Sequence, residues 1–309
     1  MTRYLLRKLG EALVVMFGVS TLIFFIQRLT GDPTFLLLPE TATPADIEAM
    51  RHALGFDRPL VVQYLSFLWD LVHFDLGRSV IQNLPVVDMI GARLPYTLML
   101  AGGALLVACV VGVPLGVLMA LRHGTPVATF LSGLVVAAQS LPTFWSGIIL
   151  IMVFAVGLGW LPPSSAGGFS HLVLPSIALG LLSMATFARV ARTAVLDELS
   201  KEYVRTARAR GVGRARLVFR HLARNASIPV ITVAALEISN LLAGAVVVET
   251  VFAWPGLGQL TMQSIVSRDF MVVQGVVLLG AFVTVGLNVL ADILYSLVDP
   301  RITLTAGRK

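Results

Sequence analysis

Six apolar runs of about 20 residues or more constrain the fold of this chain more than any other feature of its sequence. A helix needs about 20 mainly apolar residues to cross the hydrocarbon core of a bilayer. The chain is 57% hydrophobic and 13% charged, and that charge is about half of what a soluble domain carries. The sequence therefore predicts an all-α polytopic membrane protein with six transmembrane helices. The runs are approximately Leu9–Leu29, Leu94–Leu121, Val127–Leu158, Val173–Arg192, Ile228–Thr250 and Met271–Val298.

The first run follows a basic N-terminus, MTRYLLRKLG, as the apolar region of a signal peptide would. The run is too long for such a region and lacks a clear small-residue cleavage site. We therefore predict a first helix that is retained.

The distribution of positive charge predicts the orientation of the chain. Of the 23 Lys and Arg residues, 17 lie at the two termini, in the loop after the second run and between Arg189 and Arg224. Because Lys and Arg accumulate on the cytoplasmic side of membrane proteins, both termini and the loop between the fourth and fifth runs are predicted to be cytoplasmic. The chain is therefore expected to be a multi-pass membrane protein with its basic loops on the cytoplasmic side.

Residues 30–93 form an extended segment on the predicted outer side. It carries eight acidic residues, and TPADIEAMRHAL reads as a short helix with Thr43 as N-cap and Pro44 at the first helical position. VVQYLSFLWDLV has apolar residues at helical spacing, so it can lie on the membrane surface or against the helix bundle. We predict a small external subdomain.

Proline and glycine mark the remaining irregularities. The outer loops GWLPPSSAGG and FAWPGLGQL are predicted to form turns rather than regular structure. Pro142 and Pro175 interrupt the third and fourth runs and predict kinks there, which serve as packing kinks or as hinges.

Several kinds of chemistry find no support in the sequence. A Walker A loop ends in Gly-Lys followed by Ser or Thr, and none of Lys8, Lys201 and Lys309 follows a glycine. The five histidines are at least 21 residues apart, so no local histidine pair can ligate a metal. No Gly-x-Ser-x-Gly elbow is present, and the single Cys109 is interpreted as a core residue. We expect no enzyme activity, no metal site and no cofactor in this chain.

Three acidic residues stand out in the predicted spans: Glu11, Glu237 and Asp292. Glu11 and Asp292 lie near the cytoplasmic ends of their runs, where water reaches them. Glu237 lies near the middle of the fifth run, where a carboxylate must face a polar cavity, be protonated or pair with a cation. It is therefore a candidate for lining a translocation pathway or for a structural role. Asn240, Gln139 and Ser140 are further pathway candidates.

The most basic part of the chain is EYVRTARARGVGRARLVFRHLARNASIP, which carries seven arginines from Arg205 to Arg224. The GVG sequence at 211–213 predicts two short helices joined by a bend. In the second helix Leu217, Val218 and Leu222 form one apolar stripe. The segment is a solvated loop touching anionic lipid, a nucleic-acid site or a docking element for a cytoplasmic protein. Nucleic acid is disfavoured because only Tyr203 and Phe219 are available for stacking.

This segment resembles the cytoplasmic signature loop of ABC-importer permeases, which reads Glu-Ala-Ala, three residues, Gly, then about nine residues to an apolar residue and Pro. Alignment on Gly211 places Ala207 at the second Ala, and Arg205 and Thr206 at the Glu and first Ala. The departure is similar to the YVRTARAKG form of the dipeptide, oligopeptide and nickel branch. TGDP, LGFDRP, DLGRS, RLPYTL, SLPTFW, GWLPP, LPSIALG, VVVETVFAWPGLGQL, RDFMVVQG and DPRI resemble the first permease of dipeptide importers along nearly the whole chain.

The resemblance implies a type I permease fold in which the bend and its short helix couple the chain to an ATPase subunit. The residues implied in coupling are Arg205, Thr206, Ala207, Arg208, Arg210, Gly211, Arg214 and Leu217. The implied partners are a second homologous permease, two ABC ATPases that hold ATP and Mg²⁺, an extracytoplasmic solute-binding protein and the lipid bilayer, with no nucleic acid. Trp254, Pro255 and Gly256 are implied at an external gate or a contact with the binding protein.

The implied domain organisation is a first helix with an external subdomain at residues 1–93, a permease core of spans two to six at 94–299, and a tail at 300–309. The implied function is ATP-driven import of dipeptides or short peptides, with this chain forming half of the pathway. Nickel, glutathione and oligopeptides stay open as substrates. A proton-driven secondary transporter acting through Glu237 stays open as a different class.

Overall fold

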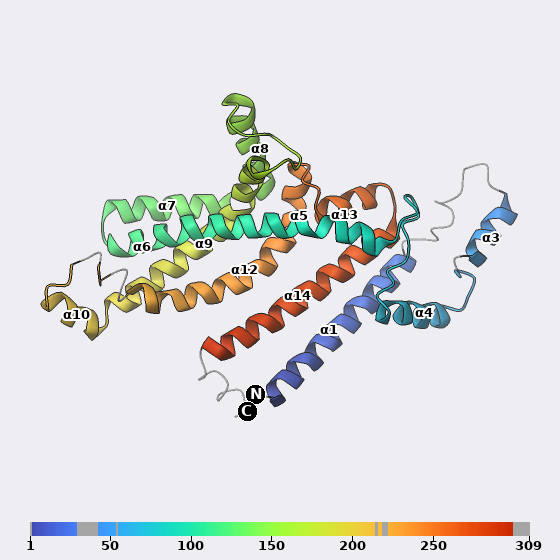
Figure 1. Ribbon diagram of the computed structural model, residues 1–309, viewed down its shortest axis with the longest axis horizontal. Coiled ribbons are helices and arrows are strands. Elements are labelled where there is room, and N and C mark those ends of the chain that lie inside the picture. The colour runs from blue at the N-terminus through green and yellow to red at the C-terminus, as the bar shows by residue number, and fades with distance from the viewer. Residues whose placement is uncertain (1, 30–42, 54, 214–215, 218–221, 299–309) are drawn as a thin grey trace. The chain divides into compact units, whose positions relative to one another are not determined.

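The computed structural model describes residues 2–29, 43–53, 55–213, 216–217 and 222–298 (Figure 1). Over these ranges the chain is helical, with an isolated bridge between Arg78 and Pro85 and no strand. The predicted all-α fold is confirmed. Two compact units are distinguished, one of Met1–Pro95 with Gly256–Gly286 and one of Tyr96–Pro255 with Leu287–Lys309.

The elements are α1 (Thr2–Leu29), α3 (Pro44–Ala53), α4 (Leu60–Val72), α5 (Val86–Val107), η1 (Ala108–Gly112), α6 (Val113–Leu121), α7 (Pro126–Ser140), α8 (Thr143–Leu150), η2 (Ile151–Gly157), α9 (Phe169–Leu199), α10 (Glu202–Ala209), α12 (Ala223–Val251), α13 (Leu257–Val266) and α14 (Phe270–Val298).

Four helices in the described ranges are long and apolar enough to cross a membrane: Val86–Leu121, Phe169–Leu199, Ala223–Val251 and Phe270–Val289. The first of them joins α5, the π-helical turn η1 and α6. A bent pair formed by α7 and by α8 with η2 makes a fifth candidate, and the apolar part of α1, Gly10–Ile26, is shorter. A multi-pass membrane protein is therefore confirmed, while the count of six spans and the cytoplasmic location of the termini stay predictions.

The third predicted span, Val127–Leu158, is not one kinked helix. Helices Pro126–Ser140 and Thr143–Gly157 meet at 103°, and Figure 1 shows α8 turning away from α7. A residue before proline is pushed out of the helical region, and Leu141 accordingly has φ −82° and ψ 127°. Pro142 therefore breaks this segment into two helices.

Two other expectations about proline and glycine need correction. Pro175 lies in the second turn of α9, and the helix continues through it from Phe169 to Leu199. The loop FAWPGLGQL was expected to contain only turns, but its second half begins α13 at Leu257, directly after Gly256. Gly256 is the N-cap of α13, so it precedes the helix and does not interrupt it.

The second unit is built around α9, which contacts α6, α7, α8, η1 and α12. Small residues bring these backbones close together. A Cβ added to Gly112 would lie 2.5 Å from the carbonyl oxygen of Met184, and one added to Gly116 would lie 2.3 Å from that of Ala188. Gly112 and Gly116 form a GxxxG pair, which is the spacing that lets membrane helices approach closely. The packing of α6 and η1 on α9 therefore depends on glycine.

Two apolar clusters lie towards opposite ends of the antiparallel pair α9 and α12. One gathers Leu174 and Leu179 of α9 with Leu241 and Val248 of α12, and Trp254 beyond it. The other gathers residues around Val195 near the C-terminal end of α9. We call these the Trp254 cluster and the Val195 cluster.

Helix α3 of the first unit is capped at its start, as predicted. The amide of Asp46 donates to the Thr43 hydroxyl at 3.3 Å, and the Asp46 carboxylate accepts from the Thr43 amide at 2.9 Å. The Thr43 hydroxyl also donates to the Asp46 carboxylate at 2.7 Å, and this bond, followed by the one from the Thr43 amide, lowers the pKa of Asp46. The expected N-cap at Thr43 is confirmed.

Helix α14 is tied to the segment before α5 within the same unit. Asp269, just before α14, is 3% exposed and accepts a hydrogen bond of 2.5 Å from Ser79. A Cβ on Gly275 would lie 2.5 Å from the side chain of Val86. The start of α14 is therefore packed closely on the segment that leads into α5.

Candidate functional site

The basic loop that follows α9 is anchored on a buried carboxylate. Glu198, in the last turn of α9, is 6% exposed. It accepts hydrogen bonds from the ammonium of Lys201, from the Tyr203 hydroxyl at 2.5 Å and from Asn225 Nδ2 at 3.3 Å. Burial, followed by this bond to Glu198, raises the pKa of Tyr203. One acidic side chain thus joins the end of α9, the start of α10 and the start of α12.

Apolar side chains complete this anchor. Val204, Leu217 and Leu222 are no more than 2% exposed and pack in the Val195 cluster. The apolar stripe of Leu217 and Leu222 was expected to serve docking, but it is used inside the chain because α9 and α12 offer it an apolar surface. Val218 lies outside the described residues. The loop therefore turns its apolar side towards its own helices.

The exposed side of the loop is cationic and bends at Gly211. Arg205, Thr206 and Arg210 are exposed, and Arg205 pairs with Glu202 at 3.1 Å. Gly211 has φ +73°, a left-handed conformation that side chains with a Cβ adopt only with strain. The bend predicted at GVG therefore lies at this glycine. Of the other expected coupling residues, Ala207 packs on the Val195 cluster. Arg208 is described only as a residue of helix α10, and Arg214 lies outside the described residues.

Glu237, the carboxylate in the middle of α12, contacts α9. It is half-buried and accepts a hydrogen bond of 2.6 Å from the hydroxyl of Ser183, which is 3% exposed. Two residues further on, the Ser239 hydroxyl is buried with no partner among the described residues. The helix pair therefore carries polar groups at the depth where hydrocarbon would surround them.

The other pathway candidates do not all meet Glu237. Gln139, at the end of α7, accepts a hydrogen bond from the guanidinium of Arg189 on α9. The Ser140 hydroxyl donates to the carbonyl of Val136 at 2.9 Å, and Asn240 is exposed. Glu237 and Gln139 are thus held by two different side chains of α9, six residues apart.

Trp254, expected at an external contact, is an interior residue. It is 2% exposed, its Nε1 donates to the carbonyl of Tyr96 at 2.9 Å, and the two rings are 6.0 Å apart. The neighbouring Pro255 is half-buried and Gly256 is buried. The indole packs inwards because the Trp254 cluster offers it both an apolar surface and a hydrogen-bond acceptor. It therefore holds the loop after α12 to α5, while the predicted external contact of this loop stays a prediction.

A buried carboxylate in the same region was overlooked in the sequence. Glu249 is 0% exposed and accepts a hydrogen bond of 2.7 Å from Thr97 of α5. Glu198 was also missed, since its partner Asn225 is 27 residues away in sequence. An acidic residue at the end of an apolar run was the available signal for both.

Comparison with protein families finds two models that match most of the chain. The binding-protein-dependent transport system inner membrane component matches residues 112–304. The N-terminal part of the binding-protein-dependent transport system membrane component matches residues 1–101.

Curated relatives match over the full length. A putative peptide transport system permease protein of Brucella abortus (strain 2308) is 39% identical over 98% of this chain and 99% of its own length. The dipeptide transport system permease protein DppB of Escherichia coli (strain K12) is 36% identical over the same shares. The di/tripeptide transport system permease protein DppB of Pseudomonas aeruginosa (strain UCBPP-PA14) is 39% identical over the same shares.

Solved structures share the fold. The MetNI methionine ABC transporter in an inward-facing conformation matches with a TM-score of 0.59 and 20% identity over 69% of this chain and 97% of that chain. An amino acid ABC transporter with histidines matches with a TM-score of 0.53 and 17% identity over 67% of this chain and 93% of that chain.

Proposed function

This chain belongs to the binding-protein-dependent transport system inner membrane components, and from that premise we propose that it is the permease subunit of an ATP-driven importer of dipeptides or short peptides. Membership confirms the sequence-based resemblance to permeases of peptide importers. The chain is a multi-pass component of a transport system in the bacterial plasma membrane. It is a transport subunit and not an enzyme of its own.

The similarity to peptide permeases along the whole chain carries this proposal. The relatives from three bacteria are named for peptide, dipeptide or di/tripeptide transport, and each aligns over 98% of this chain. A match that includes the external segment as well as the membrane helices favours the same class of substrate over nickel or glutathione.

The loop after α9 is the proposed joint with the ATPases. Its Glu198 anchor and the Val195 cluster fasten it to α9 and α12, while Arg205, Arg210 and the bend at Gly211 are exposed. A push on the exposed side then reaches two long helices through packed side chains, which favours rigid-body movement over local deformation. The ATPases, which would hold ATP and Mg²⁺, supply the energy.

The proposed pathway runs along the polar side chains of the permease core. Glu237 is the proposed site for the ammonium end of a peptide, because a carboxylate held by one hydroxyl keeps acceptor capacity for a further donor. Gln139, Ser140 and Asn240 are proposed to line the same route. A second homologous permease would complete it, two ATPases would attach below it, and a solute-binding protein would deliver the peptide outside.

Growth on peptides tests the proposal. In the native host, deletion of the gene is expected to stop growth when a dipeptide is the only source of a required amino acid, and the intact gene is expected to restore it. Uptake of radioactive nickel and of glutathione by the same two strains provides the comparison. A deletion that leaves dipeptide uptake unchanged and abolishes nickel or glutathione uptake would replace the proposed substrate.

A Glu237→Gln variant tests the role of this carboxylate. Uptake of a dipeptide with a free amino terminus is expected to fall about tenfold, because a hydrogen bond to a charged group is lost. Uptake that is unaffected would leave Glu237 a structural role. Ser140→Ala, which removes a hydroxyl already bonded to its own helix, serves as the matched control.

A further inference from the structure

The first unit contains an open cavity that the proposed coupling and pathway residues do not touch. Its volume is about 200 Å³, smaller than the roughly 300–1,000 Å³ of drug-sized sites, so it suits a ligand of few atoms. It is formed by the loop before α4, by α4, by the turn at residues 75–77 and by the first three turns of α14, with Phe24 of α1 behind them.

The back of the cavity is apolar and well packed. Phe24 is 2% exposed and Leu278 is 1% exposed. The ring of Phe24 lies 5.2 Å from that of Tyr64 and 5.5 Å from that of Phe67, and the Tyr64 hydroxyl is bonded to Thr21 at 2.7 Å. These contacts fasten α4 to α1, so the cavity is preformed.

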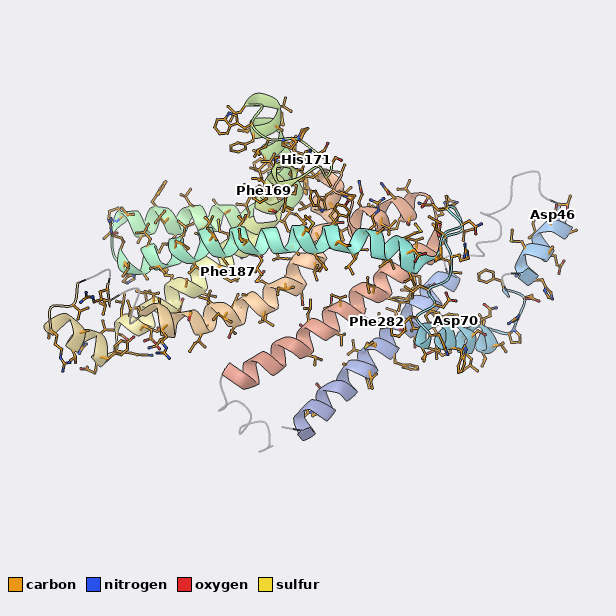
Figure 2. The ribbon with its side chains drawn as sticks, in the orientation of Figure 1. Asp46, Asp70, Phe169, His171, Phe187 and Phe282 are labelled. Atoms are coloured by element: carbon orange, nitrogen blue, oxygen red, sulfur yellow. The ribbon has the colours of Figure 1, made fainter. Side chains whose placement is uncertain are left out.

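Charges of both signs lie at its edge. Arg58 precedes α4, Asp70 lies in its last turn and Asp75 lies in the turn beyond; all three are exposed and line the cavity. Figure 2 shows Asp70 at the end of α4 that lies beside α1 and α14. Arg58 and Asp70 form no ion pair within the described ranges, and Asp75 accepts a hydrogen bond of 2.8 Å from the Gly77 amide. Unpaired cationic and anionic groups therefore share one cavity.

One atom of a polar lining residue, the Oε1 of Gln63, has no hydrogen-bond partner among the described residues. Gln63 Nε2 donates to the carbonyls of Phe56 at 3.2 Å and Arg58 at 2.7 Å, which fixes the amide so that its oxygen is the remaining acceptor. That Oε1 is buried and receives no hydrogen bond from any described residue. Buried acceptors are nearly always satisfied, so this oxygen is an exception among the polar atoms of the lining residues.

We propose that this cavity binds a small zwitterion with an apolar part, with its anionic group at Arg58, its ammonium at Asp70 and Asp75, and its apolar part against Phe24 and Phe67. A short peptide with free termini and the headgroup of an aminophospholipid share this chemistry. The proposal deepens the proposed function, since a peptide importer meets such a ligand on its outer side. It gives the external subdomain a recognition role of its own.

Binding to the purified transporter tests the proposal. The complex is placed in phosphatidylcholine nanodiscs without solute-binding protein or ATP, and labelled alanyl-phenylalanine is the probe. Arg58→Gln and Asp70→Asn are each expected to weaken binding about tenfold, while Arg58→Lys and Asp70→Glu retain it. Glu48→Gln, which removes an exposed acid outside the cavity, is the matched control. The N-acetylated dipeptide is expected to bind the unmodified protein as weakly as the free dipeptide binds Asp70→Asn. The amidated dipeptide is expected to bind it as weakly as the free dipeptide binds Arg58→Gln.

The lipid arm uses nanodiscs that contain phosphatidylethanolamine, with retained lipid counted by native mass spectrometry. Retention by the unmodified protein that is lost in Asp70→Asn, together with absent dipeptide binding, supports the same chemistry with lipid as its source. Variants that match the unmodified protein in both arms overturn the proposal. Loss of growth on dipeptides is scored separately, so a transporter of another substrate that still binds the probe here would contradict the proposed function and leave this site in place.

Discussion

The two ends of the α9 and α12 pair are held in different ways. At the end that carries the basic loop, Glu198 collects polar donors from Lys201, Tyr203 and Asn225 above the Val195 cluster. At the other end the Trp254 cluster is aromatic and aliphatic, and the Trp254 indole adds one hydrogen bond to a carbonyl.

The difference teaches where movement can enter the helix pair. Polar contacts at the loop end are directional and join three segments through one carboxylate, whereas the Trp254 cluster is held mainly by close packing. A joint that receives force therefore fits the Glu198 end, and a fixed end fits the Trp254 cluster. Four changes test this contrast.

Glu198→Ala is expected to have the largest effect. Removing the carboxylate leaves an ammonium and a buried tyrosine hydroxyl without their acceptor, which costs about 3 kcal/mol of the free energy of unfolding. Thermal unfolding of the purified protein in detergent checks the loss. Asp197→Ala removes an exposed neighbouring acid and should be near neutral. Equal stability of the two variants would break the distinction between the ends.

Gly116→Ala is expected to cost about 2 kcal/mol, because its Cβ would meet the Ala188 carbonyl at 2.3 Å and would force α6 away from α9. Both ends of the pair should loosen together, since the contact lies on the shared helix α9. Gly102→Ala, where a Cβ meets nothing within 4 Å, is the matched control. The yield of folded protein by size-exclusion chromatography measures the effect, and equal yields would contradict the close approach.

Trp254→Phe is expected to cost about 1 kcal/mol through the lost hydrogen bond to Tyr96. The exposed Trp160, changed to Phe, should cost less. If Trp254 fastens the fixed end, the melting temperature falls while the amount of co-purified ATPase stays the same. A loss of ATPase without a loss of stability would reverse the assignment of the two ends.

The smallest effect concerns pH and Tyr203. Burial, followed by the bond to Glu198, raises the pKa of Tyr203 above its ordinary value of 10.0. A raised pKa stabilises the folded form below the unfolded pKa, and this contribution is lost as pH rises through the folded pKa. The loop end should therefore loosen at strongly alkaline pH before the Trp254 end does. Tyrosine ionisation followed by ultraviolet absorbance, in the unmodified protein and in Tyr203→Phe, checks this. Ionisation of Tyr203 at or below pH 10 would contradict it.

Much of the fold follows from local sequence signals. The apolar runs predict the membrane helices, and TPAD predicts the cap at Thr43 because both partners lie within one turn. Pro142 and Pro175 show the limit of such signals. Each residue was expected to kink its segment, yet only the first breaks the helix, since tertiary contacts decide whether a helix continues past a proline.

The candidate site was less accessible from sequence because its contacts join distant segments. The bend at Gly211 could be predicted from the local sequence GVG. The hydrogen bonds of Glu198 could not, because they form only when α12 lies beside α9. Trp254 was placed at an external contact by the family resemblance alone. Its burial depends on the Tyr96 carbonyl, 158 residues earlier in the chain.

Peptide uptake into proteoliposomes tests the central claim most directly. Vesicles with the assembled transporter and external binding protein receive a labelled dipeptide, with ATP or a proton gradient supplied separately. We predict uptake with internal ATP that Gly211→Ala reduces about fivefold, since the left-handed bend resists a Cβ by about 1 kcal/mol. Gly213→Ala, where a Cβ also meets nothing within 4 Å, should transport normally. Uptake driven by the proton gradient without ATP, and unaffected by Gly211→Ala, would contradict the account.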